Sequence, residues 1–159
     1  MKPFVAIIGG KNSGKSTIIC SLTGCPTRAF RNYVVDLASN LSIFVIASSP
    51  QEDPLTLARL NRILDRVASD RDCLGIVIAI QATKPYSRLS IEDIFEAVQA
   101  THEFNIFAYS LDPEYNGTQG TTPGLQTRLN SLGIHLNQLD ARRFAFVSAA
   151  DINLASRLI

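Results

Sequence analysis

The chain has 159 residues, of which 46% are hydrophobic and 18% charged, and its formal net charge is +1. This length and composition predict one globular domain over residues 1–159 with a buried core, while the near-neutral charge argues against nucleic-acid binding through a basic face. The apolar runs are too short to span a membrane, and Cys20, Cys25 and Cys73 lack metal-ligand spacing, so we expect a cytoplasmic protein with reduced thiols.

The start of the chain predicts a strand, a loop and a helix in immediate succession. Residues 4–8 form an apolar run that is typical of a buried strand. Residues 9–17 fit the pattern G-x-x-x-x-G-K-[ST], and we call them the phosphate loop. A helix is expected to begin at about Ser13 and to end at Gly24, a residue suited to a helix C-terminus.

The next part predicts a hairpin followed by a helix. Two β-rich runs, residues 33–38 and 41–47, are separated by Ser39 and Asn40, which suit a tight turn. Asp53-Pro54 then has the form of a helix cap followed by proline in the first turn. The apolar positions of this predicted helix are Leu57, Leu60, Leu64 and Val67.

Two further strand–helix units follow. The continuous apolar run of residues 74–80 predicts a strand that is covered on both faces. Ser90 and Asp93 form a capping box at the start of an amphipathic helix. Residues 105–109 predict the next strand, and residues 112–122 predict a polar loop rich in glycine and threonine.

The last part predicts one more helix, strand and helix. A helix begins at residues 122–123 and ends at Gly133. Residues 144–147 are expected to form the final strand, and Asp151 to cap a helix that is cut short at Ile159. The order of elements predicts an α/β fold with a mainly parallel sheet, one antiparallel edge strand and helices on both faces, which makes three layers.

The phosphate loop has the chemistry of a nucleotide site. Its glycines allow positive φ, so successive N–H groups can point at phosphate oxygens, and the helix that follows adds its positive end. Lys15 supplies a positive charge for the β and γ phosphates, and the Ser16 hydroxyl can bind Mg²⁺. The candidate nucleotide-binding residues here are Lys11, Asn12, Ser13, Gly14, Lys15, Ser16 and Thr17.

Residues 9–24, G-G-K-N-S-G-K-S-T-I-I-C-S-L-T-G, resemble the opening of the Ras-like P-loop GTPase superfamily. The resemblance is strongest to the bacterial ribosome-assembly and tRNA-modification branch, with its G-x-x-N-x-G-K-S-T loop and A-L-T-G helix end. It implies a three-layer P-loop NTPase sheet that binds GTP or GDP with Mg²⁺. In that branch the asparagine matching Asn12 helps place K⁺, although Asn12 can equally cap its own turn. Lys11 is placed to reach a γ phosphate or to face solvent.

The family's D-x-x-G motif, often followed by glutamine, matches residues 47–52, A-S-S-P-Q-E. Ala47 replaces the carboxylate that helps hold the Mg²⁺ water shell. Pro50 replaces the glycine whose N–H binds the γ phosphate, and proline has no N–H. Gln51 stands where the resemblance implies a catalytic, water-orienting glutamine.

The base-reading motifs are also incomplete. Tyr109-Ser110-Leu111-Asp112 stands in place of N-K-x-D, so Asp112 is the candidate for guanine recognition, with ordinary turn formation as the alternative. Residues 148–150, Ser-Ala-Ala, match the family's S-A-K motif after the sixth strand, which makes Ser148 and Ala149 candidate base contacts.

These losses predict a GTP- or GDP-binding protein with weak or absent hydrolysis, at most a slow GTPase, that acts through a protein partner. Arg59, Arg62 and Arg66 form either a docking face for that partner or a solvated helix face. One alternative is an ATP-binding P-loop enzyme, such as a small kinase or ATPase, with Asp36 as its magnesium carboxylate. Another is a pseudo-GTPase scaffold that binds no nucleotide.

Overall fold

A computed structural model describes residues 1–82, 89–119 and 122–159. The expected polar loop at residues 112–122 is therefore described except for 120 and 121. The strands are β1 (Lys2–Gly9), β2 (Arg31–Val35), β3 (Ser42–Ile46), β4 (Cys73–Gln81), β5 (Phe104–Leu111) and β6 (Leu136–Leu139). The helices are α1 (Lys15–Thr23), α2 (Leu57–Ser69), α3 (Ile91–Thr101), α4 (Thr122–Leu129) and α5 (Ala145–Ser156), with a 3₁₀ turn, η1 (Asn130–Leu132), after α4.

The strands form one six-stranded sheet in the order β2-β3-β4-β1-β5-β6. The hairpin pair β2–β3 is antiparallel, and the other neighbouring strands are parallel. This confirms the predicted α/β fold with a mostly parallel sheet and one antiparallel edge strand. β4 lies between β3 and β1, so the carboxyl end of β3 is one strand removed from the phosphate loop that follows β1.

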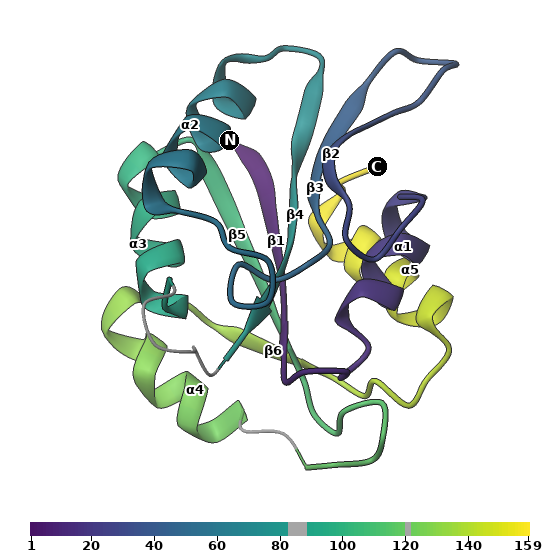
Figure 1. Cartoon of the computed structure of the whole chain (residues 1–159), viewed down its shortest axis with the longest axis vertical. Coiled ribbons are helices and arrows are strands. Elements are labelled where there is room, and N and C mark those ends of the chain that lie inside the picture. The colour runs from purple at the N-terminus through teal and green to yellow at the C-terminus, as the bar shows by residue number, and fades with distance from the viewer. Residues whose placement is uncertain (83–88, 120–121) are drawn as a thin grey trace.

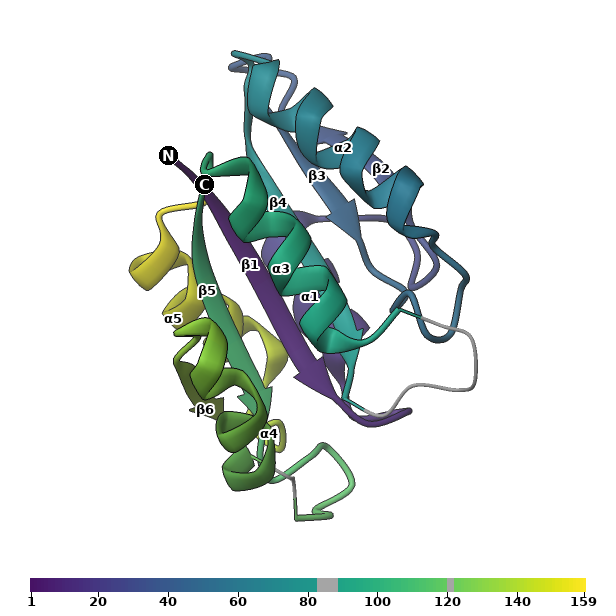
Figure 2. The ribbon, with the colours of Figure 1, turned by 90° about the vertical axis from the view of Figure 1, so that its left-hand side faces the viewer.

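Helices cover both faces of the sheet. Figure 1 shows α2, α3 and α4 on one side and α1 and α5 on the other, and Figure 2 shows the first group in front of the sheet. Alternate residues of β1 point to opposite faces of the sheet. Phe4 and Ile8 pack in the core beneath α2 and α3. Val5 and Ile7 pack in the core beneath α1 and α5. This division explains why β1 is apolar without interruption.

Several local predictions are confirmed. The Ser90 side chain accepts a hydrogen bond from Asp93 N, and Asp93 accepts one from Ser90 N, which completes the predicted capping box of α3. Gly24 ends α1 in the left-handed conformation at φ 73°. The predicted hairpin is present, but its turn is longer than the expected Ser39-Asn40 pair, because β2 ends at Val35 and β3 begins at Ser42. Asp36 therefore lies in the turn and not in the strand, and Figure 1 shows this turn at the opposite end of the sheet from the phosphate loop.

The start of α2 differs from the prediction. Thr56 caps this helix by accepting a hydrogen bond from Arg59 N, and Asp53 instead lies in a turn and pairs with Arg31 at 3.3 Å. Leu57 is therefore exposed at the first helical position, while Leu60 and Leu64 are buried as expected. Threonine satisfies the free N–H groups at a helix start as aspartate does, so the capping chemistry alone could not choose between them.

The prediction of a final strand at residues 144–147 is wrong. The last strand is β6, whose Leu136 and Leu139 are buried beside β5, and residues 145–156 form α5. α5 packs on α1 through small and apolar side chains such as Ala149 and Ile152. A short apolar run is compatible with either element. Here the burial at helical spacing begins only after the run, at Ser148 and Ala149, while Phe144 and Phe146 are exposed.

Two further details of α5 also differ. Asp151 lies inside the helix and pairs with Arg143 at 3.0 Å, so it is not the helix cap. The helix ends at Ser156, where Arg157 adopts the left-handed conformation, and does not continue to Ile159. Across residues 1–82, 89–119 and 122–159, none of the helices is long and apolar enough to cross a membrane.

Candidate phosphate-binding site

The phosphate loop connects the end of β1 to the start of α1. Asn12 and Gly14 have positive φ values of 58° and 101°, which turn the backbone around the space in front of the helix. Gly14 is the N-terminal cap of α1 and has no side chain with which to bind the helix's free N–H groups. An added Cβ at Gly9 would lie 2.5 Å from Ser13 Oγ, so any other residue at this position would require Ser13 to shift.

Lys15 is the buried cation of this loop, with only 4% of its surface exposed. Its ammonium group donates hydrogen bonds to Gly10 O and, at 3.4 Å, to Ser13 Oγ. Burial lowers the pKa of Lys15, and the nearby carboxylates of Glu52 and Glu114 act in the opposite direction. A buried ammonium group with two neutral partners and no paired anion is favourable mainly when an anionic ligand arrives.

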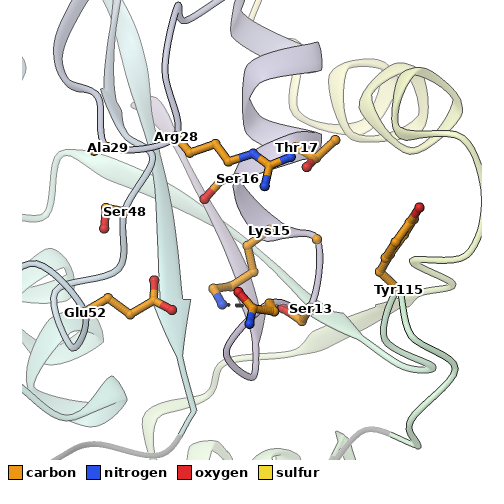
Figure 3. Close-up of a pocket in the computed structure, with 11 residues that line it drawn as sticks. Ser13, Lys15, Ser16, Thr17, Arg28, Ala29, Ser48, Glu52 and Tyr115 are labelled. Carbon is orange, nitrogen blue, oxygen red and sulfur yellow. Dashed lines mark hydrogen bonds between the residues drawn. The ribbon is translucent and has the colours of Figure 1, made fainter.

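A cavity of about 640 Å³ opens in front of the loop. Figure 3 shows Glu52 on one side of it and the Tyr115 ring on the other, with Lys15 between them. Its lining residues are Asn12, Ser13, Gly14, Lys15, Ser16, Thr17, Arg28, Ala29, Ser48, Glu52 and Tyr115. Four separate chain segments therefore meet here, and only one of them is the phosphate loop.

The segment after β5 is attached to the phosphate loop by two hydrogen bonds. Tyr115 N donates to Ser13 O at 3.1 Å, and Gly10 N donates to the Glu114 carboxylate at 2.8 Å. These bonds hold the backbone of Tyr115 beside the loop, although the residue as a whole is 68% exposed. The wall of the cavity nearest Gly14 is therefore an aromatic ring on a fixed backbone.

Two side chains with oxygen atoms, Ser16 and Glu52, also line the cavity. The Ser16 hydroxyl donates to Ala47 O at 2.7 Å, which ties α1 to the end of β3. Glu52, five residues after Ala47, is the acidic residue that lines the cavity. A hydroxyl and a carboxylate oxygen beside a phosphate site suit Mg²⁺, whose preferred ligands are oxygens. Ser16 and Glu52 are thus the residues that would supply oxygen ligands if Mg²⁺ entered with a polyphosphate.

The structure brings most of the predicted loop residues together. Six of them, residues 12–17, line the cavity. Lys11 is exposed and does not line it. Asn12 is at the cavity with its backbone in the left-handed conformation, which is compatible with both roles considered for it.

Gln51 and Asp112 lie elsewhere. Gln51 is only 3% exposed, and its side-chain amide donates to Leu89 O at 2.7 Å and accepts from Gln81 N at 3.0 Å. It therefore joins the end of β4 to the start of α3 and does not line the cavity. Asp112 is 8% exposed, and its backbone bonds to Leu139 O and to the side chain of Gln138 at the β5–β6 edge.

Ser148 and Ala149 do not occupy the loop position that the S-A-K comparison required. Both are buried inside α5, on the face that packs toward α1. Their placement follows from the corrected assignment of residues 145–156 to a helix. The expected match to a base-contacting loop after a sixth strand is therefore wrong.

Sequence reasoning missed the cavity residues that come from distant segments, namely Arg28, Ala29, Ser48, Glu52 and Tyr115. Glu52 had a weak signal, because it ends the stretch compared with D-x-x-G. Arg28 and Tyr115 had none beyond their place in connections that follow α1 and β5. In parallel sheets such connections meet at the carboxyl ends of the strands, where ligands bind.

Comparison of the chain with models of known protein families, with curated proteins and with solved structures found no match. The assignment of function therefore depends on the phosphate loop and on the cavity that it faces.

Proposed function

We propose that this protein binds a guanine nucleotide, GTP or GDP, together with Mg²⁺ and hydrolyses GTP slowly or not at all. The observation that carries the proposal is the buried Lys15 at the floor of an open cavity, next to the uncapped start of α1. Such a helix start attracts phosphate through its free N–H groups and its positive dipole. Bound Mg²⁺ would neutralise part of the phosphate charge from the side of Ser16 and Glu52.

The Ras-like part of the proposal is supported by the sequence of the phosphate loop and by the antiparallel β2–β3 edge pair. It gains no support from Ser148 and Ala149, which are in α5. Asp36 lies at the far end of the sheet, which disfavours the alternative in which it holds the magnesium of an ATP-using enzyme. The buried Lys15 and the start of α1, which no side chain caps, both face the cavity, and this arrangement disfavours a scaffold that binds no nucleotide.

Weak hydrolysis follows from the segment after β3. Pro50 has no N–H to offer a γ phosphate, and both ends of the Gln51 amide are engaged in structural hydrogen bonds. Phosphoryl transfer in this class depends on a positioned water and on stabilisation of the γ phosphate. In the described segment after β3, neither Pro50 nor Gln51 offers a free group that could position the attack, whereas Lys15 and Ser16 remain at the cavity. The output of such a protein would be a nucleotide-dependent contact with a protein partner.

We expect single-turnover hydrolysis of GTP with Mg²⁺ to be no faster than about 10⁻³ per second, the scale of intrinsic turnover without a stimulating partner. The measurement is phosphate release from radiolabelled GTP over several hours. Lys15→Ala serves as the control for contaminating phosphatases, because a signal from this site must fall in the variant when GTP is not saturating, whereas a contaminant's signal would stay unchanged. Turnover of several molecules per second without any partner would contradict the proposal.

The choice of base is tested by titration with fluorescent GDP, GTP and ATP in the presence of Mg²⁺. We expect guanine nucleotides to bind more tightly than ATP, with the loop resemblance as the reason. A preference for ATP would replace the guanine proposal with the adenine alternative. Absence of binding to all three would leave the scaffold as the remaining function.

The partner surface is the third part of the proposal. Arg59, Arg62 and Arg66 are exposed on α2, and the Arg66 guanidinium lies 5.3 Å from the centre of the Tyr33 ring on β2. This cation–π contact links α2 to the edge strand and leaves Arg59 and Arg62 as the arginines directed to solvent or to an acidic partner.

A further inference from the structure

The cavity contains an aromatic side chain that phosphate binding does not use. Tyr115 lines it and is 68% exposed, although its backbone is bonded to the phosphate loop at Ser13. Large exposed aromatic residues on a fixed backbone commonly serve as platforms for ligands, because the ring buries area at little entropic cost. Other exposed aromatics, Phe144 and Phe146, stack on each other at 5.6 Å and lie outside the cavity.

We propose that Tyr115 is the stacking platform for the base of the bound nucleotide, an inference that rests on the nucleotide-binding function proposed above. The Tyr115 ring stands on the side of the cavity away from Glu52 (Figure 3). A polyphosphate held by Lys15, Ser16 and the start of α1 would thus extend its nucleoside end toward the ring.

The backbone geometry keeps the Tyr115 ring on the side of the cavity next to Gly14. A Cβ added at Gly14 would lie 3.4 Å from Tyr115 Cβ, so the two residues are in near contact where the phosphate loop turns into α1. Glu114 holds the preceding position by accepting the hydrogen bond from Gly10 N. Stacking on a ring does not discriminate strongly between bases, since every base has a π face. Tyr115 therefore recognises a nucleoside in general, and base selectivity must come from other groups.

The test compares binding of GDP, ADP and inorganic tripolyphosphate by calorimetry, each with Mg²⁺. For Tyr115→Ala we expect affinity for GDP and ADP to fall by at least about tenfold, with tripolyphosphate affinity changed less than about twofold. Tyr115→Phe should restore nucleotide affinity, because it keeps the ring. Phe144→Ala, which removes an exposed aromatic outside the cavity, should leave all three ligands unaffected.

Each outcome has a distinct meaning. Unchanged nucleotide binding in Tyr115→Ala would overturn the stacking role, and so would an equal loss for tripolyphosphate, which would assign Tyr115 to holding the loop in shape. If the unmodified protein bound neither nucleotide nor tripolyphosphate, the proposed function itself would fail. Nucleotide-specific loss together with rescue by phenylalanine supports the proposal.

A second, independent observation concerns two thiols at the other end of α1. Cys20 Sγ lies 2.8 Å from Cys25 Sγ, because Gly24 turns the chain back at the helix end. Both sulfurs also lie near Thr27 O, at 3.6 Å and 3.7 Å. Cys20 is partly exposed and Cys25 is buried. The Cys20 sulfur is thus accessible to solvent, and the Cys25 sulfur is buried next to it.

We infer that Cys20 and Cys25 form a dithiol–disulfide couple that small-molecule disulfides can oxidise. The Cys20 thiolate attacks oxidised glutathione, which forms a mixed disulfide and releases one glutathione thiol. The Cys25 thiolate then attacks the Cys20 sulfur, which breaks the mixed disulfide, forms the Cys20–Cys25 bond and releases the second thiol. The two protons and two electrons lost by the protein end on the two released glutathione molecules.

The reaction needs long incubation. Burial, followed by the hydrogen bond shared with Cys25, raises the pKa of the Cys20 thiol to about 12, while Arg28 acts in the opposite direction. Few thiolates are therefore present at neutral pH, and attack is slow. The product restrains the chain just before Arg28 and Ala29, which line the cavity.

The test incubates the folded protein with oxidised glutathione, unfolds it, alkylates the remaining thiols and measures the mass. We expect one alkylated cysteine, Cys73, and no glutathione adduct. Cys25→Ser should instead retain glutathione on Cys20, and Cys73→Ala should form the internal bond as the unmodified protein does. A stable glutathione adduct in the unmodified protein, or no reaction when the unfolded chain does react, would overturn the inference.

Discussion

Replacement of Lys15 by alanine is expected to weaken nucleotide binding by roughly 10- to 150-fold, because a hydrogen bond to a charged group contributes about 1.5–3 kcal/mol. Lys15 is 4% exposed and lies at the floor of the cavity, so its charge acts on the ligand with little screening by water. The measurement is the dissociation constant for GDP with Mg²⁺, determined by titration of a fluorescent derivative.

Lys11→Ala is the matched control for this prediction. Lys11 belongs to the same loop but is exposed and does not line the cavity, so its removal should change affinity less than about threefold, as expected for an exposed and screened charge. Equal losses in the Lys11 and Lys15 variants would mean that the loop attracts nucleotide only by its general positive charge. That result would contradict the assigned role of Lys15.

Removal of the Lys15 charge is expected to weaken nucleotide binding but not to lower the stability of the ligand-free protein. Burial of an ammonium group without a paired anion is unfavourable, as the lowered pKa of Lys15 indicates. Lys15→Met, which keeps a chain of similar length without the charge, should therefore unfold at the same temperature or higher when no ligand is present. Nucleotide at 100 times the dissociation constant of the unmodified protein should stabilise that protein by about 2.7 kcal/mol and the variant by less than about 1.5 kcal/mol. A melting temperature well below that of the unmodified protein, without ligand, would contradict this account.

The second large effect concerns stability. Phe95→Ala is expected to lower the free energy of unfolding by about 3–5 kcal/mol, the usual cost of removing a fully buried phenyl ring. Phe95 on α3 is fully buried, and its ring meets that of Phe4 on β1 edge to face at 6.4 Å and 71°. A domain is typically stable by only about 5–15 kcal/mol, so this loss is a large part of the total.

Urea unfolding checks this prediction, with the dependence of free energy on urea unchanged if only packing is lost. The control is Phe146→Ala on α5, since Phe146 is 65% exposed and its ring stacks on the exposed ring of Phe144. Its loss should cost less than about 1 kcal/mol. A cost below that limit for Phe95→Ala would show that α3 does not pack on the sheet as described.

Features that depend on neighbouring residues were predictable from the sequence. The phosphate loop needs only a strand, a glycine-bearing turn and a helix in succession, and residues 2–23 supply all three. The capping box of α3 needs only Ser90 and Asp93 three positions apart. Their geometry is set by short-range sterics and hydrogen bonds, so the local pattern was sufficient.

Features that depend on distant packing were decided by the tertiary structure. The apolar run at residues 144–147 was compatible with a strand, but Phe144 and Phe146 are exposed. The segment leads into α5, whose later residues Ala149 and Ile152 pack in the core shared with α1. Glu52 and Tyr115 reach the cavity because parallel strands end at one edge of the sheet, a position that no local pattern encodes. Gln51 was likewise placed by distant residues, since its side-chain amide bonds to Gln81 at the end of β4 and to Leu89 before α3. The sequence alone thus determined where the proposed phosphate site lies, whereas long-range packing determined which other side chains a ligand would meet there.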